Sequence, residues 1–158
     1  MTPARKETVK AWIAAILWLI VIAIESSPLG SAANTGRFLY PLLHFLFGLD
    51  WERFVPWHFL MRKGGHVFGY GLLSILLFRA WRETVPAFGS PKWTFRWANI
   101  SVLGTAFVAS LDEWHQTFIP TRTGSVQDVI LDTCAGIGAQ ILLFVWLTLW
   151  TLRESHRT

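Results

Sequence analysis

Four stretches of the chain are long and apolar enough to cross a lipid bilayer as helices. They cover residues 9–25, 64–81, 95–112 and 129–150. A helix needs about 20 mainly apolar residues to cross about 30 Å of hydrocarbon, and lipid admits little besides helices and closed barrels. The chain is 53% hydrophobic and 15% charged, which argues against a soluble domain. We therefore expect one all-α integral membrane domain over residues 1–158, built as a four-helix bundle.

The first stretch also resembles a secretory signal peptide. Arg5, Lys6 and Lys10 accompany its start, and Ser31-Ala32-Ala33 resembles a cleavage site. The apolar run over residues 9–24 is long for the core of a signal peptide, so we interpret it as a membrane helix.

The distribution of basic residues predicts the orientation of the bundle. With four spans, both termini and the connection between the second and third spans share one side, which carries nine lysines and arginines. The other side carries five, together with seven acids. Basic residues concentrate on the cytoplasmic side, so we expect cytoplasmic N- and C-termini. We attribute the net charge of +4 to this excess of basic residues on the cytoplasmic side. We expect membrane lipids as partners and no nucleic acid, since no nucleic-acid-binding motif is present.

Residues 35–60, between the first two spans, are apolar but interrupted. The run TGRFLYPLLHFLFGL contains Pro41 and His44 and is too short to cross a membrane. We expect a re-entrant or interfacial helical segment on the outer face. It would either cover a site as a lid or simply pack on the bundle.

Ionisable and amide side chains gather where the last three spans reach the outer surface. An ionisable group within a membrane costs about 2.5 to 3.5 kcal/mol on insertion scales, so such groups tend to face one another or water. We therefore expect one shared polar chamber. The alternative for each residue is that it caps a helix, reaches the headgroups or ends a helix in water. The set, placed by helical spacing, is Lys63, His66 and Tyr70 (second span), Asp112, Glu113 and Gln116 (third), Arg122 (connection), and Asp128 and Asp132 (fourth).

The fourth stretch carries signals for where its helix begins and how closely it packs. Ser125 followed by Asp128 has the spacing of a capping box, with Asp in place of Glu or Gln, so we expect the helix to begin near Val126. Small residues allow membrane helices to approach closely. They recur in the second, third and fourth stretches at positions 64, 65, 69, 71, 104, 135, 136, 138 and 139.

The order and spacing of the polar residues resemble a known family. The pattern is Lys63-x2-His66-x3-Tyr70, then Asp112-Glu113-x2-Gln116-x-Phe118-x-Pro120-x-Arg122-x-Gly124-Ser125-x2-Asp128-x3-Asp132-x3-Gly136. Over residues 60–145 it is similar to the VanZ-like family of small bacterial membrane proteins. The resemblance implies a multi-helix fold in the bacterial cytoplasmic membrane and a role in the cell envelope. The founding member is associated with resistance to the glycopeptide antibiotic teicoplanin, but the resemblance implies no particular reaction. Position 132 often carries an amide in similar sequences, so Asp132 adds a charge.

Two hypotheses account for the polar cluster. In the first, an outward-facing pocket binds an amphiphilic envelope molecule, lipid-linked or glycopeptide-like, and in an enzymatic version also modifies it. In the second, the cluster is a non-catalytic structural or partner-binding network. Under the first, Lys63 and Arg122 hold an anionic or polar head. The remaining binding residues are Tyr70, Gln116, Asp128 and Asp132, and the catalytic set, if there is a reaction, is His66 as proton shuttle with Asp112 or Glu113.

The same residues do not predict a metal site or another cofactor. The spacings of the acids and His66 match no metal-ligand motif, and Lys63 and Arg122 would repel a cation. Ser125 is accounted for as a cap, and no nucleophile-elbow motif is present. We therefore expect no cofactor.

Overall fold

The computed structural model describes residues 2–85, 87–89 and 92–155, and this part of the chain is helical without strands. The elements are α1 (Pro3–Ser26), the 3-10 helix η1 (Pro28–Gly30), α2 (Ala32–Phe47), α3 (Trp51–Thr84), α4 (Phe95–Gln116) and α5 (Val126–Ser155). The predicted all-α class is confirmed, and α5 begins at the predicted residue. Arg157, one of the basic residues used to predict orientation, lies outside the described residues.

Local capping residues set several helix boundaries. The hydroxyl of Thr2 accepts from Arg5 N at 3.4 Å, that of Ser31 from Asn34 N at 3.2 Å, and that of Thr94 from Trp97 N at 3.4 Å. Each bond satisfies a backbone donor that has no partner inside its own helix. The end of α2 is marked by Gly48, whose φ of 63° is readily adopted by glycine.

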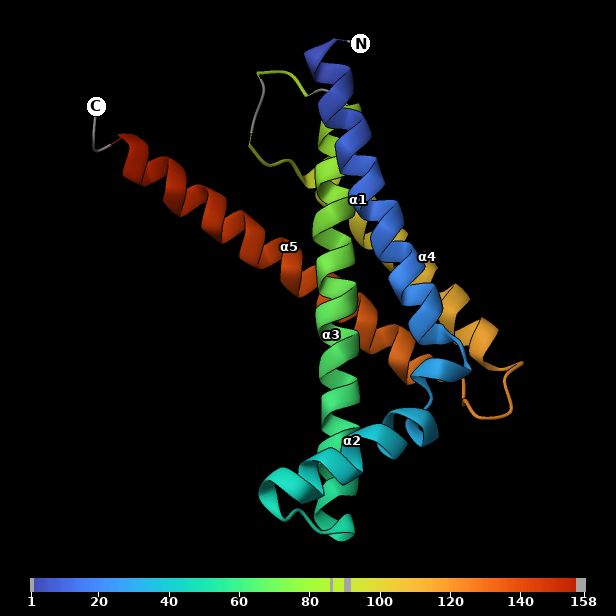
Figure 1. The fold of residues 1–158 in the computed structure, drawn as a ribbon. Helices are drawn as coiled ribbons and strands as arrows, with labels where there is room; N and C mark the ends of the chain where they lie inside the picture. Colours follow the sequence, from blue (N-terminus) through green and yellow to red (C-terminus); the bar gives the residue numbers. More distant parts are fainter. Residues whose placement is uncertain (1, 86, 90–91, 156–158) are drawn as a thin grey trace.

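The long helix α3 is the centre of the arrangement (Figure 1). It packs against α1, α4 and α5, and α2 lies across one of its ends. The start of α1, the α3–α4 connection and the end of α5 lie toward one end of the molecule. The α4–α5 connection and α2 lie toward the other. Segments far apart in the sequence therefore meet around the N-terminal half of α3.

The segment expected over residues 35–60 is not one element. It is divided between α2 and the first turns of α3, which is 34 residues long and begins at Trp51. The helix break falls at residues 48–50, because the positive φ of Gly48 ends α2 there. The span expected over residues 64–81 is consequently the C-terminal part of a longer helix.

Two helices of the described chain, α1 and α5, are long and apolar enough to cross a membrane. Only 17% of the apolar stretch of each helix is buried inside the protein, so most of its side chains face outward rather than into a core. Extensive apolar exposure of this kind marks a surface made for lipid or another partner. These two helices suggest membrane association. The other two predicted spans lie within α3 and α4, which do not combine the required length with the required apolar character.

Close contacts at the crossing of α3, α4 and α5 involve small and polar residues. The hydroxyl of Ser74 donates to the carbonyl of Gly136 at 3.1 Å, and the amide of Gln140 donates to the carbonyl and hydroxyl of Ser74, both at 2.9 Å. A Cβ added to Gly136 would lie 3.1 Å from a methyl carbon of Thr105. At Gly138 an added Cβ would meet no atom within 4 Å. Gly136 therefore mediates the close approach that the small residues predict, and Gly138 does not.

Candidate functional site

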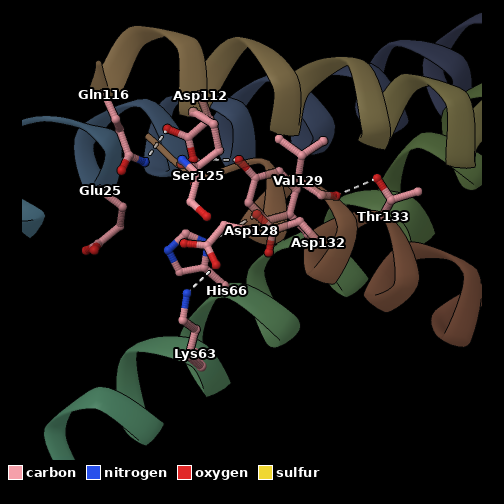
Figure 2. Close-up of polar contacts among 12 residues, drawn as sticks. Glu25, Lys63, His66, Asp112, Gln116, Ser125, Asp128, Val129, Asp132 and Thr133 are labelled. Carbon is pink, nitrogen blue, oxygen red and sulfur yellow. Dashed lines mark hydrogen bonds and ion pairs between the residues drawn. The ribbon is translucent and has the colours of Figure 1, made fainter. Parts of the chain in front are cut away.

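Three residues on one face of α3 pair with acids on the two neighbouring helices. Figure 2 shows Lys63 and His66 of α3 beside Asp128 and Asp132 of α5. Lys63 forms an ion pair with Asp128 of α5. One helical turn further on, His66 Nδ1 lies 3.2 Å from Asp132 Oδ2. Tyr70 donates its hydroxyl to Asp112 Oδ2 of α4 at 2.7 Å. The predicted faces of the three helices thus meet: the i, i+3 pair of α3 faces the i, i+4 pair of α5, and Tyr70, one turn further along α3, faces α4.

The end of α4 adds two more contacts to this cluster. Gln116 donates its amide to Asp112 Oδ1 at 3.0 Å, so both oxygens of the Asp112 carboxylate have partners. Glu113 Oε2 accepts the backbone N–H of Ser125 at 2.7 Å, next to the start of α5. Glu113, His66 and Asp132 also offer potential metal-ligand atoms that all lie within 4.8 Å of one another. Tyr70, Asp112, Glu113, Gln116 and Asp132 are buried.

Arg122 holds the α4–α5 connection against the end of α1. Its guanidinium donates to the carbonyl of Glu25 and, from Nη2 at 3.2 Å, to the carbonyl of Ser27. These carbonyls lie at the C-terminal end of a helix, where backbone acceptors lack partners within the helix. Burial lowers the pKa of Arg122, and the positive charge of Arg62 lowers it further. The carboxylates of Asp112, Glu25 and Glu113 raise it in part. The guanidinium nevertheless remains charged, as arginine does in proteins.

We expect Arg122→Ala to loosen the end of α1. The loss of charged hydrogen bonds to carbonyls is worth about 2 kcal/mol, which corresponds to a fall in Tm of about 4–8 °C. Hydrogen exchange should accelerate at residues 24–30 and not along α5. Arg122→Lys should restore only part of the loss, since an ammonium cannot reproduce the planar fork. Arg37→Ala, at an exposed position of α2, is the control. Equal Tm values for all the proteins would contradict this role.

A pocket of about 360 Å³ lies between α1, α2, α3 and α4. Apolar and charged residues line it together. They are Trp18, Val21, Ile22, Leu39, Met61, Phe68 and Tyr70, the charged or titratable Glu25, His58, Arg62, His66, Asp112 and Arg122, and Gly30, Thr35, Gly65, Gly69 and Gln116.

The structure divides the predicted site residues into two groups. His66, Tyr70, Asp112, Gln116 and Arg122 line the pocket, and the others do not. Lys63, which we expected to hold a ligand's head, is instead paired with Asp128 outside the lining. The remaining residues outside the lining are Glu113 and Asp132.

The lining residues that the sequence analysis did not predict include Arg62, Glu25 and Trp18. Arg62 donates to the carbonyl of Gly30 at 2.5 Å, and Trp18 donates its indole N–H to the carbonyl of Gly69 at 2.8 Å. Arg62 stands directly before Lys63, but neighbouring residues on a helix point about 100° apart. Only the rotation of α3 about its axis decides which of the two cations faces the pocket. An acid and an indole at the outer half of the first span were the available signals for Glu25 and Trp18.

A comparison with protein families identifies the chain. A family model described as VanZ/LLP1 matches residues 11–149, which include most of α1 as well as the polar cluster. No curated protein and no solved structure matches this chain. The match extends beyond residues 60–145, where the motif resemblance was found, and covers most of the chain. The chain belongs to the VanZ-like family.

Proposed function

We propose that the pocket binds an amphiphilic molecule of the bacterial cell envelope, with a phosphate- or sugar-bearing head and an apolar tail. The observation that carries this proposal is the composition of the lining, in which Trp18, Ile22 and Phe68 occur together with Arg62 and Arg122. The volume of about 360 Å³ lies within the range of about 300–1,000 Å³ typical of ligand pockets. An apolar wall with a few charged groups suits an amphiphile better than a small polar metabolite.

The two arginines are the groups that would recognise the head. A guanidinium carries five N–H donors and pairs with phosphate through two parallel hydrogen bonds. Arg62 and Arg122 each use donors on backbone carbonyls, so each is held in place while other donors remain. Gln116 and His66, which also line the pocket, supply an amide and an imidazole for hydroxyl or phosphate oxygens.

We further propose that four spans cross the cytoplasmic membrane, with both termini in the cytoplasm and the pocket toward the outer leaflet. The arrangement of α1, α5 and the two connections in Figure 1 is compatible with this topology. The phenylalanines at 38, 45 and 47 of α2 are 78%, 85% and 75% exposed. A short helix with such a surface is suited to the membrane interface. A pocket for a lipid-linked or glycopeptide-like molecule would connect the protein with teicoplanin susceptibility.

Filling the pocket tests the proposal. Gly65 lines the pocket, and a Cβ added there meets no atom within 4 Å. Gly65→Leu should therefore fold normally but lose lipid adducts in native mass spectrometry of gently extracted protein. Its matched control is Gly64→Leu, since Gly64 has equal space but does not line the pocket. In cells, Gly65→Leu should abolish any change in teicoplanin susceptibility caused by the protein, and Gly64→Leu should preserve it.

The head group is tested separately with nanodiscs containing phosphatidylglycerol or phosphatidylcholine. Arg62→Gln should weaken binding of phosphatidylglycerol about tenfold, since a charged hydrogen bond contributes about 1.5 kcal/mol or more. Arg53→Gln, at an exposed position of the same helix, should leave it unchanged. Unchanged lipid binding in both Gly65→Leu and Arg62→Gln would overturn the proposal. A phenotype that is lost only in proportion to Tm would instead favour a structural or partner-binding network.

A further inference from the structure

Three potential metal ligands converge from three different helices. His66 belongs to α3, Glu113 to α4 and Asp132 to α5, and one potential ligand atom of each lies within 4.8 Å of the others. Glu113 is 4% exposed and Asp132 is 0% exposed. This convergence was not visible in the sequence, because the three residues are separated by 47 and 19 positions and belong to no single motif.

Both carboxylates keep one oxygen free of any hydrogen bond. Among the described residues, Glu113 Oε1 and Asp132 Oδ1 are buried without a hydrogen-bond partner. The other oxygen of each is engaged, Glu113 Oε2 by the backbone N–H of Ser125 and Asp132 Oδ2 by His66. A buried acceptor without a partner costs about 1–3 kcal/mol, and more when it is charged. Each carboxylate is thus oriented by one oxygen and still requires something at the other.

The nearby cations do not occupy this space. In the sequence, Lys63 and Arg122 lie close to the acids, and their positive charges were expected to repel a metal ion. In the structure Lys63 is paired with Asp128, and the guanidinium of Arg122 donates to the carbonyls of Glu25 and Ser27. Asp128 therefore balances the charge of Lys63, and Asp112, whose Oδ2 accepts the neutral Tyr70 hydroxyl, adds a negative charge to the same cluster. The electrostatic objection to a bound cation is therefore removed.

We propose that His66, Glu113 and Asp132 form a three-ligand site for a divalent transition metal of the zinc class. An imidazole with two carboxylates suits zinc and its neighbours, whereas magnesium and calcium favour all-oxygen sites. Three protein ligands leave a coordination position open, as in catalytic rather than structural zinc sites. Zinc bonds of about 2.0–2.2 Å require the three side chains to draw together around the ion. The metal would link α3, α4 and α5, and this inference does not depend on amphiphile binding.

Metal content and thermal stability test the site in the full-length protein. The purified protein, without any histidine tag, is treated with a chelator and then dialysed against zinc chloride. The wild type should retain one equivalent of zinc by mass spectrometry of the element. Its Tm should rise by about 5–10 °C at a hundredfold excess of zinc over the dissociation constant. Cobalt, used as a spectroscopic probe, should give visible absorption of a four- or five-coordinate site.

Single variants assign the metal to these residues. His66→Ala, Glu113→Gln and Asp132→Asn should each lose the bound zinc and the zinc-dependent rise in Tm. Glu25→Gln removes an acid that lines the pocket without removing a ligand, and it should bind zinc like the wild type. Helix content by circular dichroism identifies any variant that fails to fold. Absence of zinc binding by the wild type, or equal binding by the three variants, would overturn the proposal.

Discussion

Gly136→Leu should destabilise the protein by on the order of 3 kcal/mol, because it inserts a large side chain where three helices meet. A Cβ at this position already lies 3.1 Å from a methyl carbon of Thr105 and 3.5 Å from the Cβ of Ser74. The carbonyl of Gly136 also accepts the hydroxyl of Ser74. Separating α5 from α3 to admit leucine would break this bond and the bonds of Gln140 to Ser74.

Thermal unfolding in a mild detergent measures this effect. The Tm of Gly136→Leu should fall by about 6–12 °C, and Gly136→Ala should fall between this variant and the wild type. Gly138→Leu is the matched control on the same helix, where an added Cβ has open space. Its stability should stay within about 1 kcal/mol of the wild type, since replacing a helical glycine is favourable by up to about that amount. Equal melting of the two leucine variants would show that the helices do not cross at Gly136.

Asp112→Ala should also have a large effect, because it removes the acceptor shared by two buried donors. Tyr70 and Gln116, which are 3% and 4% exposed, both donate to the Asp112 carboxylate. Each donor left buried without a partner costs about 1–3 kcal/mol. We expect a loss of about 2–5 kcal/mol in the free energy of unfolding, measured by denaturation in detergent.

Two further variants separate this hydrogen-bond network from simple loss of volume. Asp112→Asn keeps the shape and one carbonyl oxygen, so it should lose less than Asp112→Ala. The double variant Tyr70→Phe/Asp112→Ala should lose less than the sum of its two single variants, because both remove the same bond. Additive losses would indicate that Tyr70 and Asp112 do not stabilise the protein through their contact.

Local signals in the sequence predicted more of the fold than of the site. The all-α class follows from apolar runs of about twenty residues, and the start of α5 at Val126 follows from the spacing of Ser125 and Asp128. The start of α3 at Trp51, well before the span expected from residue 64, was not predicted. The left-handed conformation of Gly48 ends α2, and α3 begins three residues later at Trp51.

The partners within the site were less predictable than its members. Periodicity placed Lys63, His66 and Tyr70 on one face, and the structure brings that face to α4 and α5. It did not show that Lys63 would be paired with Asp128 while Arg62 faced the pocket. Nor did it show that Glu113 and Asp132 would each keep one buried oxygen without a partner.

The amino-acid sequence by itself determined the all-α class, which residues share a helical face and to which family the chain belongs. These properties depend on neighbours within a few turns and on the high free energy of burying lone charges. The tertiary structure alone decided the pairing of each ionisable group, the lining of the pocket and the convergence of His66, Glu113 and Asp132. Those properties depend on the rotation and crossing of α3, α4 and α5. The close contact at Gly136 sets that crossing, and it involves residues more than thirty positions apart.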